Sequence, residues 1–266
     1  MKPVNEHNRR AWDQRARDRQ RHTAIASEKD FLDPLTAVDP YGWLPRPISG
    51  RRVLCLASGG GRQGPLLAAA GAKVTVVDLS PEMLKLDREV ATRRGLHLKT
   101  VEASMDDLHM LADSSFDIVL QPVSTCYVSD ISKVYCEVAR ILTDGGFYLS
   151  KHKQPVNLQA ALLPSLRYYV LKQPYYRTGA LPPAASGFHR ESGTLEFLHR
   201  WEELLGGLCR AGFVIEDVKE PQMGKPEAEV GTYEHRCCYV PPYIELKARR
   251  LEQTRAANAR IGLWTP

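Results

Sequence analysis

The clearest structural signal in the sequence lies in residues 53–64, which read Val53-Leu54-Cys55-Leu56-Ala57-Ser58-Gly59-Gly60-Gly61-Arg62-Gln63-Gly64. Its first five residues form a short apolar run ended by glycines, which is typical of a buried parallel strand. The glycines have the spacing G-x-G-x-x-G, which permits a tight turn and lets a ligand approach the backbone closely. Residues 65–70 then predict a helix, because proline is tolerated in a first helical turn.

An acidic residue extends this pattern. Asp78 follows Gly59 by 19 residues and comes directly after the second predicted strand, residues 73–77. A carboxylate at that position can accept hydrogen bonds from the hydroxyl groups of a ribose. The sequence therefore predicts a ribose-bearing ligand at the carboxyl ends of the strands.

Strands and helices alternate from residue 51 to residue 150. Further strands are expected at 98–102, 115–120 and 147–150, and further helices at 81–94 and 131–142. The helix at 81–94 has clear ends, because Ser80 and Pro81 suit its start and Gly95 suits its stop. This alternation predicts an α/β fold with a doubly wound parallel sheet.

The flanking segments have a different character. Residues 1–30 are polar and rich in arginine, which predicts one or two exposed helices with a thin apolar stripe. Residues 33–50 are rich in proline and predict a loop, and residues 151–195 add aromatic residues to prolines, as a lid or substrate wall would. The remaining elements are expected to be a helix at 195–211, strands at 213–218 and 235–240, and a last helix from about Ile244, with Ile244, Ala248 and Leu251 on one face.

These segments divide the chain into three parts. Residues 1–50 are expected to form an N-terminal helical cap whose basic residues border the ligand cleft. Residues 51–245 are expected to form the sheet domain, with a lid insertion at about 151–195. Residues 246–266 form a C-terminal helix and tail.

Composition excludes several classes of protein. The chain has 266 residues, of which 43% are hydrophobic and 25% charged, so it is neither disordered nor collagen-like. No apolar run could span a membrane and no secretory signal is visible, so we expect a cytoplasmic protein. The six cysteines include no CxxC pair, which predicts reduced thiols and no metal site. The adjacent Cys237 and Cys238 are expected to be ordinary thiols on opposite faces of a strand.

The charge is mildly basic. The formal net charge is +5, and the basic residues of the N-terminal segment are interleaved with acidic ones. This pattern argues against a nucleic-acid partner or an RNA-modifying enzyme. Nothing in the sequence indicates an oligomeric state.

Taken in order, these segments resemble those of class I S-adenosylmethionine-dependent methyltransferases, in the branch similar to ubiquinone- and menaquinone-type enzymes. The resemblance is carried by the glycine motif, by the second strand with its acid, by the fourth strand, by the helix and turn before strand five, and by Ala211-Gly212-Phe213. It covers about 50–150 and 195–240. It implies a Rossmann-like seven-stranded sheet with a C-terminal antiparallel hairpin.

The resemblance also implies S-adenosyl-L-methionine as the methyl donor and a small organic molecule as the acceptor. It places the methionine part of the donor near Gly59, Gly60 and Gly61, and the ribose near Asp78. The residues expected to bind this cofactor are Ala57, Ser58, Gly59, Gly60, Gly61, Gln63, Asp78, Leu79, Met83, Ser104, Met105, Asp106, Pro122 and Val123. The chain departs from the family at Cys55, where an acid is usual, and at Ser104, where an aspartate is frequent.

Methyl transfer from an activated sulfonium needs an aligned nucleophile and a dry site, so proximity and orientation can carry most of the catalysis. Tyr127 follows the fourth strand and is expected to shape the acceptor site. A proton acceptor is needed only for a hydroxyl or a protonated amine. The candidates for that role are His152, His189 and His199.

Two alternatives remain open from the sequence. The same glycine loop could serve an NAD(P)-dependent oxidoreductase, because the G-x-G-x-x-G spacing is shared. The departures from the family pattern also leave room for a catalytically silent S-adenosylmethionine-binding protein. No residue pattern indicates the nucleophilic atom of the acceptor.

Overall fold

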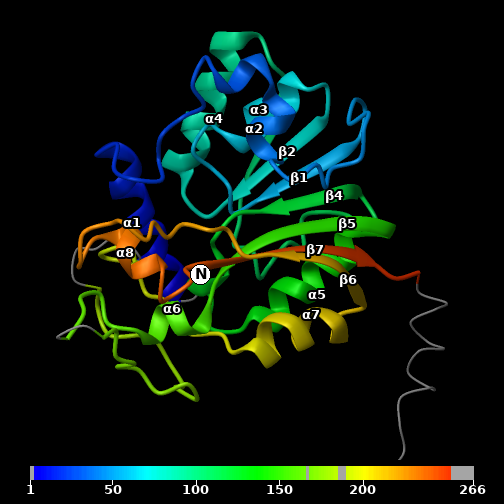
Figure 1. Ribbon diagram of the computed structural model, residues 1–266. Coiled ribbons are helices and arrows are strands. Elements are labelled where there is room, and N and C mark those ends of the chain that lie inside the picture. Colours follow the sequence, from blue (N-terminus) through cyan, green and yellow to red (C-terminus); the bar gives the residue numbers. More distant parts are fainter. Residues whose placement is uncertain (1–2, 166–167, 185–189, 253–266) are drawn as a thin grey trace, which may run out of the picture.

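A computed structural model describes residues 3–165, 168–184 and 190–252. A seven-stranded sheet of order β3-β2-β1-β4-β5-β7-β6 runs through its centre (Figure 1). Strands β1 to β5 are parallel, and β7 is antiparallel to both β5 and β6. The strands are β1 Arg52–Leu56, β2 Lys73–Asp78, β3 Leu98–Glu102, β4 Phe116–Gln121, β5 Leu142–Lys153, β6 Phe213–Lys219 and β7 Tyr243–Arg250. The predicted doubly wound sheet and its antiparallel hairpin are confirmed.

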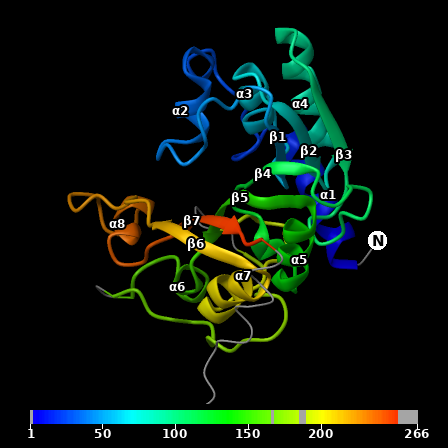
Figure 2. The same cartoon turned by 90° about the vertical axis from the view of Figure 1, so that its right-hand side faces the viewer.

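Helices cover both faces of the sheet. Figures 1 and 2 show α3 and α4 on one side of it and α5 and α7 on the other. A separate apolar cluster fills each side, one centred on Val53, Val76 and Leu84 and the other on Leu54, Val138 and Leu208. The helices are α1 Pro3–Arg17, α2 Pro34–Val38, α3 Gln63–Ala69, α4 Pro81–Arg94, α5 Ile131–Ile141, α6 Pro155–Gln159, α7 Gly207–Arg210 and α8 Tyr233–Cys237, with a π-helical turn Glu202–Gly206 before α7.

Helix α4 follows its sequence signals at both ends. The side chain of Ser80 accepts a hydrogen bond from the N–H of Met83, which satisfies one of the free donors at the start of the helix. Gly95 ends the helix with φ +63°, a left-handed conformation that glycine adopts without strain. The predicted bounds of α4 are therefore confirmed.

Helix α1 is bound to the rest of the protein through polar side chains. Asn8 Nδ2 donates to the carbonyl oxygens of Tyr127 and Leu195, each at 3.1 Å, and Asn8 Oδ1 accepts from the N–H of Leu195. At the other end, Asp13 Oδ1 accepts a hydrogen bond of 2.6 Å from Ser80 Oγ, next to the start of α4. The segment is thus one helix whose buried face is mainly polar, instead of the thin apolar stripe expected from the sequence.

The C-terminal part corrects two predictions. Residues 233–237 form helix α8 where a strand was expected, and residues 243–250 form strand β7 where a helix was expected. Ile244 and Ala248 are four residues apart, a spacing that suits one face of a helix and one face of a strand. The structure resolves this ambiguity, because Leu246 is buried with them and β7 pairs with β5 and β6. Residues 253–266 of the expected tail lie outside the described ranges.

Three smaller differences concern bounds and thiols. The helix expected at 195–211 begins only at Trp201, and the expected loop at 33–50 contains the short helix α2. Cys237 and Cys238 are free thiols, as expected, but they lie at the end of a helix and not on a strand. Across residues 3–165, 168–184 and 190–252, no helix combines the length and hydrophobicity that a membrane span requires.

Arg236 fastens α8 to the segment that follows β5. Its side chain is 1% exposed and donates to Asn157 Oδ1 at 2.6 Å and to the carbonyl oxygens of Asn157 and Ala161 at 3.0 Å. Arg236→Met would leave these buried acceptors without donors, so we expect the free energy of unfolding to fall by about 2–3 kcal/mol. Urea unfolding followed by circular dichroism measures this loss. The exposed Arg93→Met in α4 serves as the control, and equal midpoints for both variants would contradict the prediction.

Candidate functional site

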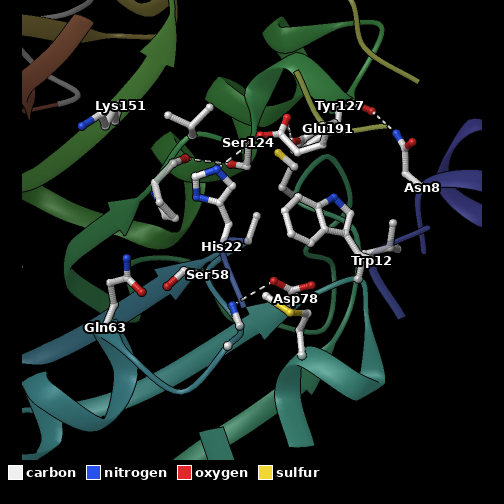
Figure 3. Close-up of a pocket in the computed structure, with 18 of the residues that line it drawn as sticks. Asn8, Trp12, His22, Ser58, Gln63, Asp78, Ser124, Tyr127, Lys151 and Glu191 are labelled. Atoms are coloured by element: carbon white, nitrogen blue, oxygen red, sulfur yellow. Dashed lines mark hydrogen bonds and ion pairs between the residues drawn. The ribbon is translucent and has the colours of Figure 1, made fainter. Parts of the chain in front are cut away.

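A cavity of about 530 Å³ lies at the carboxyl ends of β1, β2 and β4. Its floor is the glycine loop with the end of β2, and its cover comes from α1 and residues 21–25. The far wall is built by the turn after β4, by Glu191 from the insertion and by Tyr233 and Tyr243. Figure 3 shows Asp78 and Ser58 on one side of this space and Tyr127 with Glu191 on the other.

Two carboxylates, the half-buried Asp78 and the buried Asp87, hold the glycine loop. The N–H of Gly59 donates to Asp78 Oδ2 at 2.8 Å, and the N–H of Gly60 donates to Asp87 Oδ2 at 2.9 Å. Gly60 has φ +123°, and a β-carbon there would lie 3.0 Å from Met83 Cε, so the position favours glycine on both grounds. Sequence reasoning found Asp78 by its spacing but missed Asp87, which reaches the loop from the middle of α4.

The environment of Asp78 suits a polar ligand. Its second oxygen, Oδ1, accepts a hydrogen bond of 2.9 Å from the N–H of Ser80. Burial raises the pKa of Asp78 to about 6, while the N–H groups of Ser80 and Gly59 oppose that rise. The carboxylate is therefore mainly ionised at neutral pH and can still accept hydrogen bonds from a ligand in the cavity.

One polar atom in the cavity wall lacks a hydrogen-bond partner among the described residues. The hydroxyl of Ser58 is buried beside the thiol of Cys55, and its oxygen makes no hydrogen bond of normal geometry with the described residues. A buried hydroxyl without a partner costs free energy, which a polar ligand at this position would recover. The residues present therefore fit a ligand that offers polar groups to the glycine loop and hydroxyl groups to Asp78.

Most of the residues expected to bind the cofactor line this one cavity. Only two of them do not. Gly61 packs against Ile25 and Val90, and Asp106 faces an adjoining groove, where Ser104 Oγ donates to it. The residues that line the cavity are Ala57, Ser58, Gly59, Gly60, Gln63, Asp78, Leu79, Met83, Ser104, Met105, Pro122 and Val123. The structure thus brings together residues from four loops spread over 67 positions of the sequence.

A buried charge network forms the opposite wall. Glu191 Oε2 accepts hydrogen bonds from Tyr127 Oη at 2.7 Å and from Lys153 Nζ at 2.6 Å. Lys153 also donates to Glu196 Oε1 at 3.1 Å, and Glu196 pairs with Arg190 at 2.8 Å. Burial would raise the pKa of Glu191, but the ammonium of Lys153 and the hydrogen bond from Tyr127 act together against burial and hold that pKa below its usual value. Glu191 therefore presents a fixed negative charge to the cavity.

Comparison with known proteins shows the family to which the chain belongs. Residues 54–150 match the family model described as a methyltransferase domain. An uncharacterized methyltransferase of Bacillus subtilis, YbaJ, is 35% identical over 237 residues, which cover 82% of this chain and 91% of the relative. The chain belongs to the class I S-adenosylmethionine-dependent methyltransferases. The oxidoreductase alternative is thereby set aside.

Two further comparisons bear on the methyltransferase. An S-adenosylmethionine-dependent methyltransferase from Mesorhizobium loti has the same fold, with a TM-score of 0.64 and 22% identity, and covers 83% of this chain and 100% of that one. A ubiquinone biosynthesis O-methyltransferase of Xylella fastidiosa is 32% identical, but only over 38% of this chain and 41% of its own. The ubiquinone-type branch is therefore not shown for this methyltransferase.

The structure places neither His152 nor His199 in the cavity of the methyltransferase. His152 is fully buried behind the wall, with its two ring nitrogens 2.8 Å from Thr125 Oγ1 and Ser150 Oγ. Burial lowers its pKa to about 3, so it is neutral and enclosed. His199 Nε2 lies 3.0 Å from the carbonyl oxygens of Thr125 and Val128 and joins the turn after β4 to residue 199. His189 lies outside the described residues.

Tyr127 does line the cavity, whereas several other lining residues were missed. They come from α1 and the segment after it, from Lys151 in β5, and from the region of α8 and β7. Arg21 is one of the basic N-terminal residues expected to border the cleft, and Glu191 belongs to the insertion expected to form a lid or substrate wall. The residues that were missed include Asn5, Asn8, Trp12, His22, Ile25, Lys151, Met223, Tyr233 and Tyr243. No local pattern marks them, because segments far apart in the chain bring them together. Within the described ranges, no three His, Cys, Asp or Glu side chains gather as the ligands of a metal ion would.

Proposed function

We propose that the chain transfers a methyl group from S-adenosylmethionine to a small organic acceptor bound in the same cavity. The observation that supports this most is the continuity of the cavity. One space of about 530 Å³ joins the glycine loop and Asp78 to a second compartment walled by Trp12, Tyr127 and Glu191. The donor supplies a methyl group that is already activated, so the protein has to bind the two substrates, align them and exclude water from the site.

The donor side of the cavity, formed by the glycine loop and Asp78, is proposed to bind S-adenosylmethionine. Asp78 accepts hydrogen bonds from the ribose hydroxyls, and the backbone of Gly59 and Gly60 lies against the methionine part. Ser58 Oγ offers a hydrogen bond to the polar end of that part, which satisfies its buried hydroxyl. Leu79 and Met83 present apolar surface to the ribose or the adenine ring.

The acceptor side of the cavity is aromatic and partly covered. Trp12 packs edge-to-face on Tyr127 with ring centroids 5.6 Å apart, and Tyr243 contributes a further ring. Helix α1 and residues 21–25 form the cover over this compartment, and the insertion after β5 contributes Glu191. This arrangement supports a planar or apolar organic acceptor held away from bulk water.

A second feature bears on the nature of the acceptor. The partial similarity to a ubiquinone biosynthesis O-methyltransferase supports transfer to oxygen. Tyr127 itself is a poor proton acceptor, because burial raises its pKa well above its usual value. We assign it the role of shaping the compartment and fixing Glu191.

The test of the proposed function is donor-product binding. We expect isothermal titration of the purified chain with S-adenosylhomocysteine to show one site with a dissociation constant in the micromolar range. Titration with NADH under the same conditions is the control and should give no heat of binding. Failure to bind S-adenosylhomocysteine at tens of micromolar would contradict the proposal. A protein that binds it and transfers no methyl group to any acceptor would fit the catalytically silent alternative.

A further inference from the structure

We propose that His22 takes the proton that the methyl acceptor loses, and that Glu191 orients His22 for this task. The acceptor would then be a molecule whose nucleophilic oxygen or nitrogen carries a proton before transfer. This inference rests on the proposed function and identifies a residue that sequence reasoning overlooked. His152 and His199 are enclosed in the wall, whereas His22 lines the cavity itself.

The position of His22 is the first argument. Its carbonyl oxygen lies 3.9 Å from the point where a β-carbon of Gly60 would stand, so the residue rests over the glycine loop. Its Nε2 lies 3.7 Å from Glu191 Oε1 on the opposite wall. Figure 3 shows the imidazole in the middle of the cavity, between the side of Asp78 and the side of Tyr127. His22 therefore stands between the proposed methionine site and the proposed acceptor site.

The backbone holds His22 in a strained conformation. His22 has φ +70°, a left-handed conformation that is unfavourable for a residue with a β-carbon. Hydrogen bonds on its C-terminal side fix the segment, from the N–H of Thr23 to the carbonyl oxygen of Gln20 and from the N–H of Ala26 to that of Gly61. The imidazole is thus directed into the cavity by an anchored segment.

Glu191 is oriented by its own partners. Tyr127 and Lys153 both donate to Oε2, so the other carboxylate oxygen, Oε1, is the one that faces His22. A carboxylate near Nε2 favours the tautomer with its proton on that nitrogen. Nδ1 is then the nitrogen that can accept a proton. The same carboxylate stabilises the imidazolium that forms, as an orienting acid does for other catalytic histidines.

The charges around His22 keep it neutral before the reaction. Burial lowers its pKa below the usual 6.5, Glu191 opposes this, and Arg21, Lys153 and Arg15 act in the same direction as burial. These groups come from α1, the segment after it, β5 and the insertion. A neutral imidazole is the form that a general base requires.

The proposed step conserves atoms and electrons. The acceptor oxygen or nitrogen forms a bond to the methyl carbon while the bond between that carbon and the sulfur breaks, and its electron pair stays on sulfur as a thioether. The proton of the acceptor passes to Nδ1 of His22. In the ligand-free cavity the side chain of His22 is 41% exposed, so the proton can leave to water once the products have departed.

The test follows the pKa of His22 by nuclear magnetic resonance and needs no acceptor. The full chain is titrated in two complexes, one with neutral S-adenosylhomocysteine and one with sinefungin, whose amine carries a positive charge where the methyl sulfonium stands. The imidazole signal is assigned with His22→Gln. A positive charge beside the imidazole disfavours its protonation, so we expect the pKa to be lower in the sinefungin complex by about one unit.

A second measurement tests the role of Glu191. Glu191→Gln removes the negative charge that partly offsets the effect of burial on His22, so the pKa of His22 in the ligand-free protein should fall further. The control, Glu89→Gln on the exposed face of α4, should leave that pKa unchanged. If both ligands bind and the pKa of His22 is the same in both complexes, His22 does not adjoin the transferred methyl group and the inference is wrong. If neither ligand binds, the proposed function itself fails.

Discussion

Lys153→Met is expected to lower the free energy of unfolding by about 3–5 kcal/mol, because it leaves two buried carboxylates without their shared cation. Lys153 Nζ lies 2.6 Å from Glu191 Oε2 and 3.1 Å from Glu196 Oε1, and its side chain is 1% exposed. Burial alone would lower the pKa of Lys153, but these neighbours outweigh it and raise that pKa. Chemical unfolding monitored by circular dichroism measures the loss.

Two further variants make this prediction specific to charge. Lys85→Met on the exposed face of α4 should change stability by less than about 0.5 kcal/mol. The double variant Lys153→Met, Glu191→Gln should be more stable than Lys153→Met alone, because Glu196 keeps its ion pair with Arg190. A double variant as unstable as the single one would show that packing of the lysine stem, and not charge, causes the loss.

Asp78→Asn is expected to weaken the binding of S-adenosylhomocysteine by about 100-fold at pH 7.5. The change removes a charged acceptor for two ribose hydroxyls, and each such hydrogen bond contributes about 1.5–3 kcal/mol. The amide oxygen can still accept from the N–H of Gly59, whereas the amide NH2 then faces the N–H of Ser80, so part of the loss comes from the start of α4. Isothermal titration measures the affinity. Asp107→Asn, an exposed carboxylate paired with His109, is the control and should bind as the unaltered chain does.

From the pKa of Asp78 we also predict how the affinity for S-adenosylhomocysteine depends on pH. Because the pKa of Asp78 is raised to about 6, a ligand that requires the ionised form binds fully above that pH and more weakly below it. We expect affinity to fall by about tenfold from pH 7.5 to pH 5 and the fall to be smaller in Asp78→Asn. Asp87, whose pKa burial raises to about 7, titrates in the same interval. The pH dependence of Asp87→Asn therefore shows how much of the loss of affinity comes from Asp87 and how much from Asp78. An affinity independent of pH over this range would contradict an ionised Asp78 in the complex.

The donor half of the site could be predicted from local signals. The strand before the glycines, the spacing to Asp78 and the caps of α4 each depend on neighbours within about 20 residues, and the structure places them together at one edge of the sheet. The periodicity of buried strands and the conformational demands of glycine act over such short distances. This is why the positions of strands β1 to β5 along the chain and the floor of the cavity could be predicted from the sequence.

The acceptor half could not be predicted in the same way. Glu191 meets Tyr127 across 64 residues, and Asn8 meets Leu195 across 187. No pattern within either segment indicates its partner, because a hydrogen bond between distant residues leaves no periodic signal. The histidines illustrate the consequence: His152 and His199 follow strand and helix signals but are enclosed, while His22 reaches the cavity from a polar segment.

Short-range signals in the chain were enough to predict an α/β sheet whose glycine loop and Asp78 lie together at the carboxyl ends of the strands, since these features depend on local backbone geometry. Tertiary structure alone decided that residues 243–250 form a strand, because Ile244 and Ala248 fit both periods until β5 and β6 pair with them. It also decided which side chains line the part of the cavity opposite the glycine loop. That choice depends on how α1, the insertion and α8 pack over the strand ends, where contacts span most of the chain.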